Sequence, residues 1–147
     1  MQSQRFKPLF DKLYLILLIP TAIVVLGATA MVLIFPEPVA LVLIILVDLF
    51  VLYFFVSPLF GYVELRESSV FIKYGFFLKK EIPYEKIRGV VKDRKFYSDS
   101  IMSLKNSFEH VNIKYNAFDV TSVSVVDNDE FIETLEERLD GKHLSKS

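Results

Sequence analysis

Two long apolar runs fill the first part of the chain. Residues 13–35 form a run of 23 positions without a charged side chain, and a second run extends from residue 39 to residue 60 with Asp48 inside it. A helix of 23 residues rises about 35 Å, which is enough to cross a hydrocarbon core of about 30 Å. Pro36, Glu37 and Pro38 separate the runs and cannot continue a helix. The pattern predicts two antiparallel transmembrane helices, over 13–35 and 39–60.

A cleaved signal peptide is the alternative for the first run, because Ala28-Thr29-Ala30 resembles a cleavage site. The run continues past these residues to Phe35, which favours a retained helix. Basic residues precede the first run and follow the second, whereas the turn between them has none. By the positive-inside rule both termini are cytoplasmic, and Tyr14 and Tyr62 lie at the inner membrane interface.

The chain changes character after the second run. Alternating apolar and polar positions predict short strands over residues 62–66, 70–74, 76–82, 87–92, 108–115 and 120–126, with a further candidate at 101–104. A bulge is expected at Thr121 and Ser122, where the alternation slips. In the strand over 108–115, His110 alternates with apolar neighbours and is expected to point outward.

A helix closes the chain. Asp127 or Asn128 is expected to cap it, its apolar side chains recur at helical spacing, and Gly141 is expected to end it. The expected fold class is an α-helical transmembrane hairpin followed by an α+β domain, in which a small, strongly bent antiparallel sheet or barrel is capped by one C-terminal helix. The expected divisions are a cytoplasmic lead (1–12), the two spans, a cytoplasmic domain (62–141) and a flexible tail (142–147).

Composition narrows the chemistry. The chain of 147 residues is 52% hydrophobic, has no cysteine and only two histidines, and carries a net charge of −1 from 17 basic and 18 acidic residues. The lack of cysteine removes disulfides and thiolate chemistry. A balanced charge gives no general attraction to nucleic acid. No phosphate-binding glycine loop, HExxH motif or paired-carboxylate constellation is present. We therefore expect no enzyme activity, cofactor, metal site, nucleic-acid partner or small-molecule substrate.

Asp48 is the acid inside the second apolar run. An acid at this depth costs about 2.5–3.5 kcal/mol on insertion scales. Counted from the turn, Asp48 lies level with Leu26 and Gly27, where small residues permit close helix approach, and Thr29 supplies the nearest hydroxyl. We therefore expect Asp48, Gly27 and Thr29 to form an intramembrane polar contact that holds the hairpin or an oligomer together. A tolerated acid and a proton or ion relay are the alternatives.

Charge is also segregated in the second half of the chain. A basic patch is expected from Lys79, Lys80, Lys86, Arg88, Lys92, Arg94 and Lys95, whereas the terminal helix carries an excess of acids against Arg138. Each basic residue near an anionic leaflet contributes about 1 kcal/mol. The patch is thus a candidate surface for membrane lipid or a protein partner. Solvated strand edges are the alternative interpretation.

The order of elements resembles a known family. The strand pair 62–74, the Ile82-Pro83-Tyr84-Glu85-Lys86-Ile87 element, the late strand 110–115 and the Asp129–Ile132 helix start resemble the bacterial pleckstrin-homology-like (PH-like) domain, in its YyaB-like small membrane-protein version. This resemblance implies a two-pass protein of the bacterial cell membrane and no enzyme activity. The expected function is a membrane-anchored binding or scaffold module for a protein or the inner leaflet. Alternatives are bacteriocin immunity or envelope-stress protection, and a small transporter or proton-relay subunit using Asp48.

Overall fold

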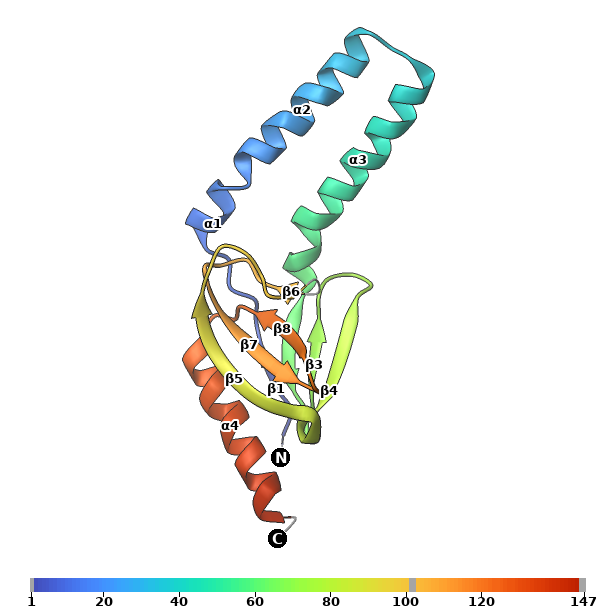
Figure 1. The fold of residues 1–147 in the computed structure, drawn as a ribbon. Coiled ribbons are helices and arrows are strands. Elements are labelled where there is room, and N and C mark those ends of the chain that lie inside the picture. The colour runs from blue at the N-terminus through green and yellow to red at the C-terminus, as the bar shows by residue number, and fades with distance from the viewer. Residues whose placement is uncertain (1, 101–102, 146–147) are drawn as a thin grey trace.

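A helical hairpin stands on a β-rich domain (Figure 1). The computed structural model describes residues 2–100 and 103–145. The hairpin consists of α1 (Lys12–Ile16), α2 (Ile19–Ile34), α3 (Pro38–Val56) and the short 3-10 helix η1 (Ser57–Phe60). The domain consists of β1 (Gln4–Phe6), β2 (Tyr62–Leu65), β3 (Ser69–Lys73), β4 (Lys79–Pro83), η2 (Tyr84–Lys86), β5 (Ile87–Arg94), β6 (Ser103–Leu104), β7 (Glu109–Tyr115), β8 (Asp119–Val123) and α4 (Asn128–Ser145).

The first apolar run is not one helix, and in this respect the prediction over 13–35 is wrong. Helix α1 ends at Ile16, and α2 begins at Ile19 with a proline in its first turn. Pro20 has no N–H to donate to the carbonyl of Ile16, and its ring clashes with that carbonyl, so the two segments cannot form a continuous helix. The 16 residues of α2 rise only about 24 Å.

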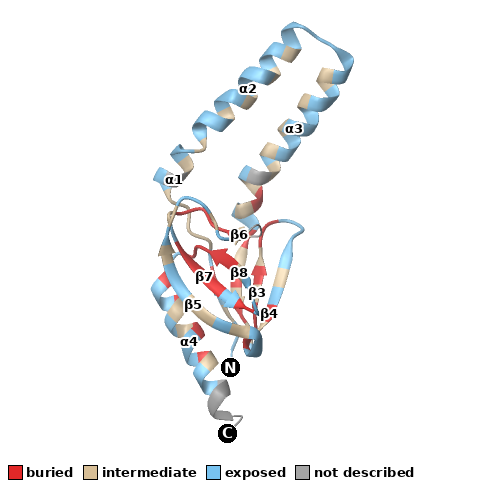
Figure 2. Ribbon diagram, viewed as in Figure 1, coloured by how far each residue is buried: buried red, intermediate tan, exposed pale blue. Residues whose placement is uncertain are grey.

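The turn between the two long helices has the expected form. The Glu37 side chain caps α3 by accepting a hydrogen bond of 2.8 Å from the backbone N–H of Ala40, and Pro38 occupies the first turn. The stretch Pro38–Phe60 is 23 residues long with a mean hydropathy of 3.0, which is long and apolar enough to cross a membrane. The two helices run antiparallel, and almost all their surface is exposed (Figure 2).

The domain contains two four-stranded sheets, so the prediction of a single bent sheet or barrel is wrong. The first sheet has the order β1-β2-β3-β4, and the second has the order β5-β7-β8-β6. All pairings are antiparallel except that of β6 with β8. Helix η2 separates β4 from β5 and passes the chain from one sheet to the other. The buried residues of the two sheets and α4 form one core (Figure 2).

The predicted lead is part of this domain. Residues 4–6 form strand β1, which pairs antiparallel with β2 and aligns Gln4 with Leu65 and Phe6 with Val63. Phe6 packs edge-on against Phe131 of α4, with the ring centroids 5.2 Å apart. Further backbone bonds join the lead to the second sheet, including Leu9 N–H to the Ser124 carbonyl at 2.9 Å. The hairpin is therefore inserted between two adjacent strands of one sheet.

Three local predictions on the second sheet and α4 are wrong. The register of β7 with β8 runs without interruption through Thr121 and Ser122, and the irregularity lies instead in β5 between Ile87 and Gly89. The slip in alternation arises because Thr121, Ser122 and the following valine are all buried, so this strand is covered on both faces. Helix α4 also continues past Gly141 to residue 145, because that glycine does not adopt the left-handed conformation of a helix end. The third correction, to His110, is described with the site below.

Candidate functional site

A polar contact joins the two helices of the hairpin. The Thr29 Oγ1 atom lies 3.0 and 3.1 Å from the two carboxyl oxygens of Asp48, and it lies 2.9 Å from the Val25 carbonyl oxygen one turn earlier. A hydroxyl has one hydrogen, so it donates to one of these acceptors at a time. Gly27 is not part of the contact, because a Cβ added there would have no atom within 4 Å. The structure thus brings Asp48 and Thr29 together and leaves Gly27 facing open space.

The seven basic residues do not form one open face. The Lys92 Nζ atom donates to Asp129 at 2.8 Å, and Lys95 pairs with Asp93 at 2.7 Å. The hydrogen bond from each lysine to its carboxylate raises the pKa of that lysine. These two charges are held by acids of the same domain, which weakens their attraction for an external anion.

Two more of these residues are held by backbone or aromatic groups. The Arg88 guanidinium donates to the carbonyls of Asn116 and Ala117 at 3.3 and 3.2 Å, and so braces the turn between β7 and β8. The Lys80 ammonium donates to the Tyr115 hydroxyl and lies over that ring. The remaining three, Lys79, Lys86 and Arg94, lie on different elements: the start of β4, the end of η2 and the end of β5.

Aromatic side chains gather where the domain meets the hairpin. The turn between β3 and β4 lies beside η1 at the base of α3 (Figure 1). Phe77 stacks on Tyr53 of α3 with the ring centroids 6.3 Å apart, and Phe76 packs on Phe60 at 4.5 Å. Gly75 permits this approach, since a Cβ there would lie 1.6 Å from the Ser57 hydroxyl oxygen. This turn is thereby seated against the end of the apolar helix.

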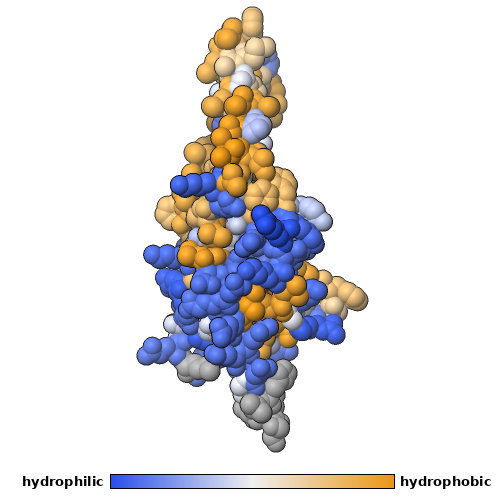
Figure 3. All heavy atoms as spheres, turned by 90° about the vertical axis from the view of Figure 1, so that its left-hand side faces the viewer, coloured by the Kyte–Doolittle hydropathy of each residue, from blue (hydrophilic) through white to orange (hydrophobic). Residues whose placement is uncertain are grey.

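This aromatic turn remains open to the outside. The Phe77 side chain is 82% exposed. Figure 3 shows the hairpin as an apolar surface above a mainly hydrophilic domain. Rings at such a boundary suit the interface of a bilayer, where aromatic side chains are enriched. Tyr62, expected at the inner interface, is stacked under Arg5 at 4.2 Å at the start of β2; the side chain of Tyr14, expected beside it, lies outside the described residues.

A buried polar layer lies on the outer face of the second sheet, and sequence reasoning missed it. The Asn112 amide donates to Asp99 at 3.1 Å and accepts from the Ser122 hydroxyl at 2.6 Å. The Lys105 Nζ donates to the carbonyls of residues 95, 96 and 97, and desolvation by burial lowers its pKa. These bonds fasten the connection between β5 and β6 over the sheet.

His110 belongs to this layer, so the prediction that it points outward is wrong. Its side chain is fully buried, its Nδ1 lies 3.0 Å from the Phe108 carbonyl, and its Nε2 is buried without a hydrogen-bond partner in the part of the chain described. The alternation of strand β7 placed His110 and Asn112 opposite the core, but the β5–β6 connection covers that face. Among residues 2–100 and 103–145, no group of three histidines or acids is close enough to hold a metal ion.

Helix α4 is tied to the start of the chain by a buried arginine. Arg138 donates from Nη1 to the carbonyls of Leu65 and Arg66, and from Nη2 to the carbonyl of Gln2, each at 3.0 Å. The Asp127 carboxylate caps the helix by accepting from the Glu130 N–H at 2.9 Å, as predicted. The arginine therefore serves the packing of the domain rather than an external ligand.

Comparison with known proteins bears on the region that follows the hairpin. The family model described as "Bacterial PH domain" matches residues 61–139, which begin immediately after η1 and end within α4. The searches of curated proteins and of solved structures returned no match. The matched region holds seven of the eight strands and most of the closing helix, in the order in which the structure arranges them. On this match over more than half of its length, the chain belongs to the bacterial PH domain family.

Proposed function

We propose that this protein is a non-enzymatic binding module anchored in the bacterial cell membrane by its hairpin, with the PH domain held against the cytoplasmic leaflet. The observation that carries the proposal is the insertion of the hairpin between β1 and β2, which are neighbours in one sheet. A chain that leaves and re-enters the same sheet keeps both ends of the hairpin on one side of the membrane. This supports a two-pass arrangement with both termini on the same side, and the positive-inside rule assigns that side to the cytoplasm.

The attachment also restricts how the domain is oriented. Two adjacent strands lead into the hairpin, and the aromatic turn is packed on the base of α3. These contacts support a PH domain that presents its hairpin-side end, including Phe77, to the inner leaflet. The opposite end carries Phe118, which is 96% exposed in the turn between β7 and β8, and it faces the cytoplasm, where a protein partner is accessible. The two preceding apolar helices favour the YyaB-like subgroup of the family.

Cysteine labelling tests this arrangement directly, because the natural chain has no cysteine to interfere. We expect a membrane-impermeant maleimide to label Glu37→Cys in intact spheroplasts and to label Phe118→Cys only after lysis. The unmodified chain is the matched control. Labelling of both positions in intact cells, or recovery of the protein in the soluble fraction, would contradict the proposal.

Contact with the leaflet needs a separate measurement. A nitroxide spin label at residue 77 is expected to be more accessible to oxygen, which partitions into lipid, than to a water-soluble nickel complex. The same label at residue 118 is expected to show the reverse. Equal water accessibility at both positions would leave the anchor intact but would refute the leaflet-facing orientation.

A further inference from the structure

We propose that the cavity between the hairpin and the PH domain binds one uncharged, single-chain amphiphile with a hydroxyl-bearing head, the chemistry of a monoacylglycerol. Its hydrocarbon chain lies between α2 and α3, and its head is held by the side-chain amide of Asn106. This inference rests on the proposed location of the hairpin in the membrane. It adds a ligand site that the matched domain alone does not contain, because most of the walls come from residues before position 61.

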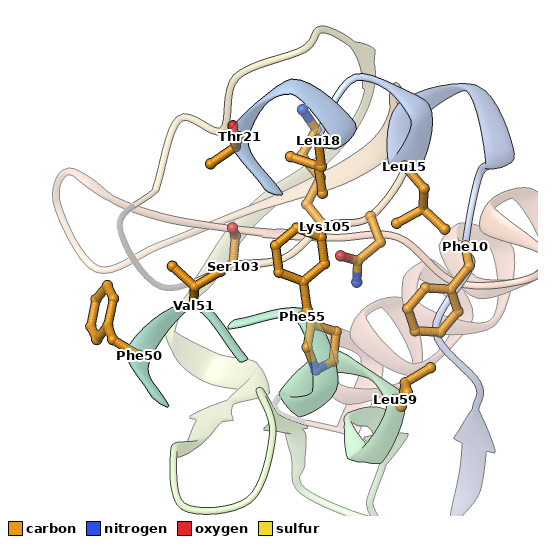
Figure 4. A pocket seen from close by; sticks show the side chains of 12 residues that line it. Phe10, Leu15, Leu18, Thr21, Phe50, Val51, Phe55, Leu59, Ser103 and Lys105 are labelled. Carbon is orange, nitrogen blue, oxygen red and sulfur yellow. The ribbon is translucent and has the colours of Figure 1, made fainter. Parts of the chain in front are cut away.

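The cavity lies where the two helices diverge above the domain. Its volume is about 630 Å³, and Figure 4 shows side chains from the hairpin and from the β6 region surrounding a common space. Leu15 precedes the break in the first apolar run, whereas Leu18 and Thr21 follow it, so both parts of that run contribute to one wall. Helix α3 and η1 contribute further apolar wall through Phe50, Val51, Phe55, Pro58 and Leu59.

Asn106 is a polar side chain that lines this cavity and has no partner in the part of the chain described. The residue is only 9% exposed, and among residues 2–100 and 103–145 its side-chain amide forms no hydrogen bond. Its backbone is fixed, because its carbonyl accepts from the Asp11 N–H at 2.9 Å. Buried amides are normally hydrogen-bonded, and this one offers two N–H donors and a carbonyl acceptor. A molecule inside the cavity is therefore the expected partner of the amide.

The lining offers no open charge to a ligand. Lys105 is the one charged side chain among the described lining residues, and its Nζ already donates to three backbone carbonyls. The carboxylates of Asp93 and Asp99 also interact with this charge. A charged ligand would lose its hydration here without gaining a free counter-charge, which is unfavourable. The cavity therefore suits an uncharged ligand.

The polar part of the lining matches a hydroxyl-bearing head. Ser103 and Thr21 contribute hydroxyls beside the amide of Asn106. Each of these three groups both donates and accepts, and a ligand hydroxyl has the same two capacities. The rest of the lining is mainly aliphatic and aromatic, which matches a hydrocarbon chain.

The dimensions favour a small amphiphile over a helix from a second copy. A helix about 10 Å wide occupies roughly 400 Å³ per 5.4 Å turn, so the cavity accommodates little more than one helical turn. Its volume falls within the range of about 300–1,000 Å³ that is usual for small-ligand sites. The hydrocarbon chains of bulk phospholipid are the competing occupant, and the experiment must separate them from a selected ligand.

Tryptophan fluorescence tests the site, because the natural chain has no tryptophan. Phe10→Trp places a reporter on the cavity wall, and Leu43→Trp places a reference on an exposed part of α3. The full-length variants are reconstituted into phosphatidylcholine vesicles that contain a minor fraction of one probe. The three probes share one brominated acyl chain, which quenches tryptophan on contact, and differ in the head: a monoacylglycerol, the methyl ester and a lysophosphatidylglycerol.

We expect saturable quenching of Phe10→Trp by the brominated monoacylglycerol. The methyl ester, which has no donor, and the anionic lysophosphatidylglycerol should each need about a tenfold higher fraction for the same quenching. Unbrominated monoacylglycerol should restore the fluorescence. The Leu43→Trp reference should be quenched in proportion to any of the three probes, and strongly in vesicles made of brominated phosphatidylcholine.

Asn106→Leu separates recognition from packing, because leucine has a similar size and no hydrogen-bonding group. In the Phe10→Trp chain this change should abolish the preference for the monoacylglycerol over the methyl ester. It should leave the urea unfolding midpoint in micelles unchanged or raised, since the amide has no partner among the described residues. A lowered midpoint would assign the amide a structural role and would overturn the proposal.

Other outcomes separate the possible failures. Quenching of Phe10→Trp that is equal for the three probes and rises in proportion to their amount would assign the space to bulk lipid chains. That result would overturn the site while leaving the membrane anchor standing. Preference for the lysophosphatidylglycerol would refute an uncharged ligand. Failure of brominated phosphatidylcholine to quench Leu43→Trp would refute the anchor itself.

Discussion

Truncation of Phe6 is the most direct test of the way this domain is assembled. Phe6 lies in β1, before the hairpin, yet it is 7% exposed and packs edge-on against Phe131 of α4. Replacing a buried phenylalanine by alanine costs about 3–5 kcal/mol, and an edge-on aromatic pair accounts for about 0.5–1.5 kcal/mol beyond the buried area. We therefore expect Phe6→Ala to lower the free energy of unfolding of the domain by at least about 3 kcal/mol, which raises the ratio of unfolded to folded molecules more than roughly a hundredfold.

Phe118→Ala is the matched control, because it makes the same chemical change at a position that is 96% exposed. A change at such a site is expected to stay within about 0.5 kcal/mol. Both variants of the full chain are unfolded with urea in nonionic micelles, and the folded fraction is read by pulse proteolysis. If Phe6→Ala costs no more than Phe118→Ala, the first strand is not part of the core and the inserted-hairpin arrangement is refuted.

Three further predictions follow from buried or polar contacts. Arg138→Met removes three charge-assisted bonds to backbone carbonyls and is expected to destabilise the domain by about 3–5 kcal/mol in the same urea assay; a cost below that of a surface substitution would contradict its bracing role. Burial raises the pKa of Tyr74 to about 12 from an ordinary value of 10, so its contribution to stability is complete below pH 10 and is lost as pH rises through 12; Tyr74→Phe should show a shallower loss of stability across that window, and parallel curves would refute the assignment. Asp48→Asn should keep the contact with Thr29 and Asp48→Leu should lose it, so only the leucine variant is expected to lower the thermal stability of the hairpin in micelles or alter its crosslinked oligomer pattern; identical behaviour of the two variants would remove the structural role of the contact.

The sequence was informative wherever structure depends on local pattern. The strands β2, β3, β5 and β7 lie within two residues of their predicted positions, because alternation reports a half-buried strand directly. Strand β8 begins one residue before its predicted start and ends three residues before its predicted end. The cap at Asp127 and the turn at Glu37 could also be predicted from the sequence, since each depends on residues three positions apart. Pro20 causes the break before α2. The prediction missed the break because it relied on the length of the apolar run.

The candidate site was less predictable, because its residues are brought together from distant segments. Asp48 and Thr29 are 19 positions apart but meet across a hairpin, so counting from the turn was enough to suggest their contact. His110 and Asn112 gave no such indication, because what covers them is the connection between β5 and β6. The basic residues illustrate the opposite error: they are neighbours in sequence, but Asp129 of α4 and Asp93 of β5 pair with two of them.

By itself, the sequence determined that two apolar segments precede a domain of short strands closed by a helix, because hydropathy and short-range periodicity are properties of contiguous residues. Only the tertiary structure decided that three residues before the hairpin complete the sheet after it, since β1 acquires partners solely through hydrogen bonds to β2. It likewise decided where the helices diverge above β6 to leave a cavity. Both features arise from pairing across long separations, which no local pattern encodes.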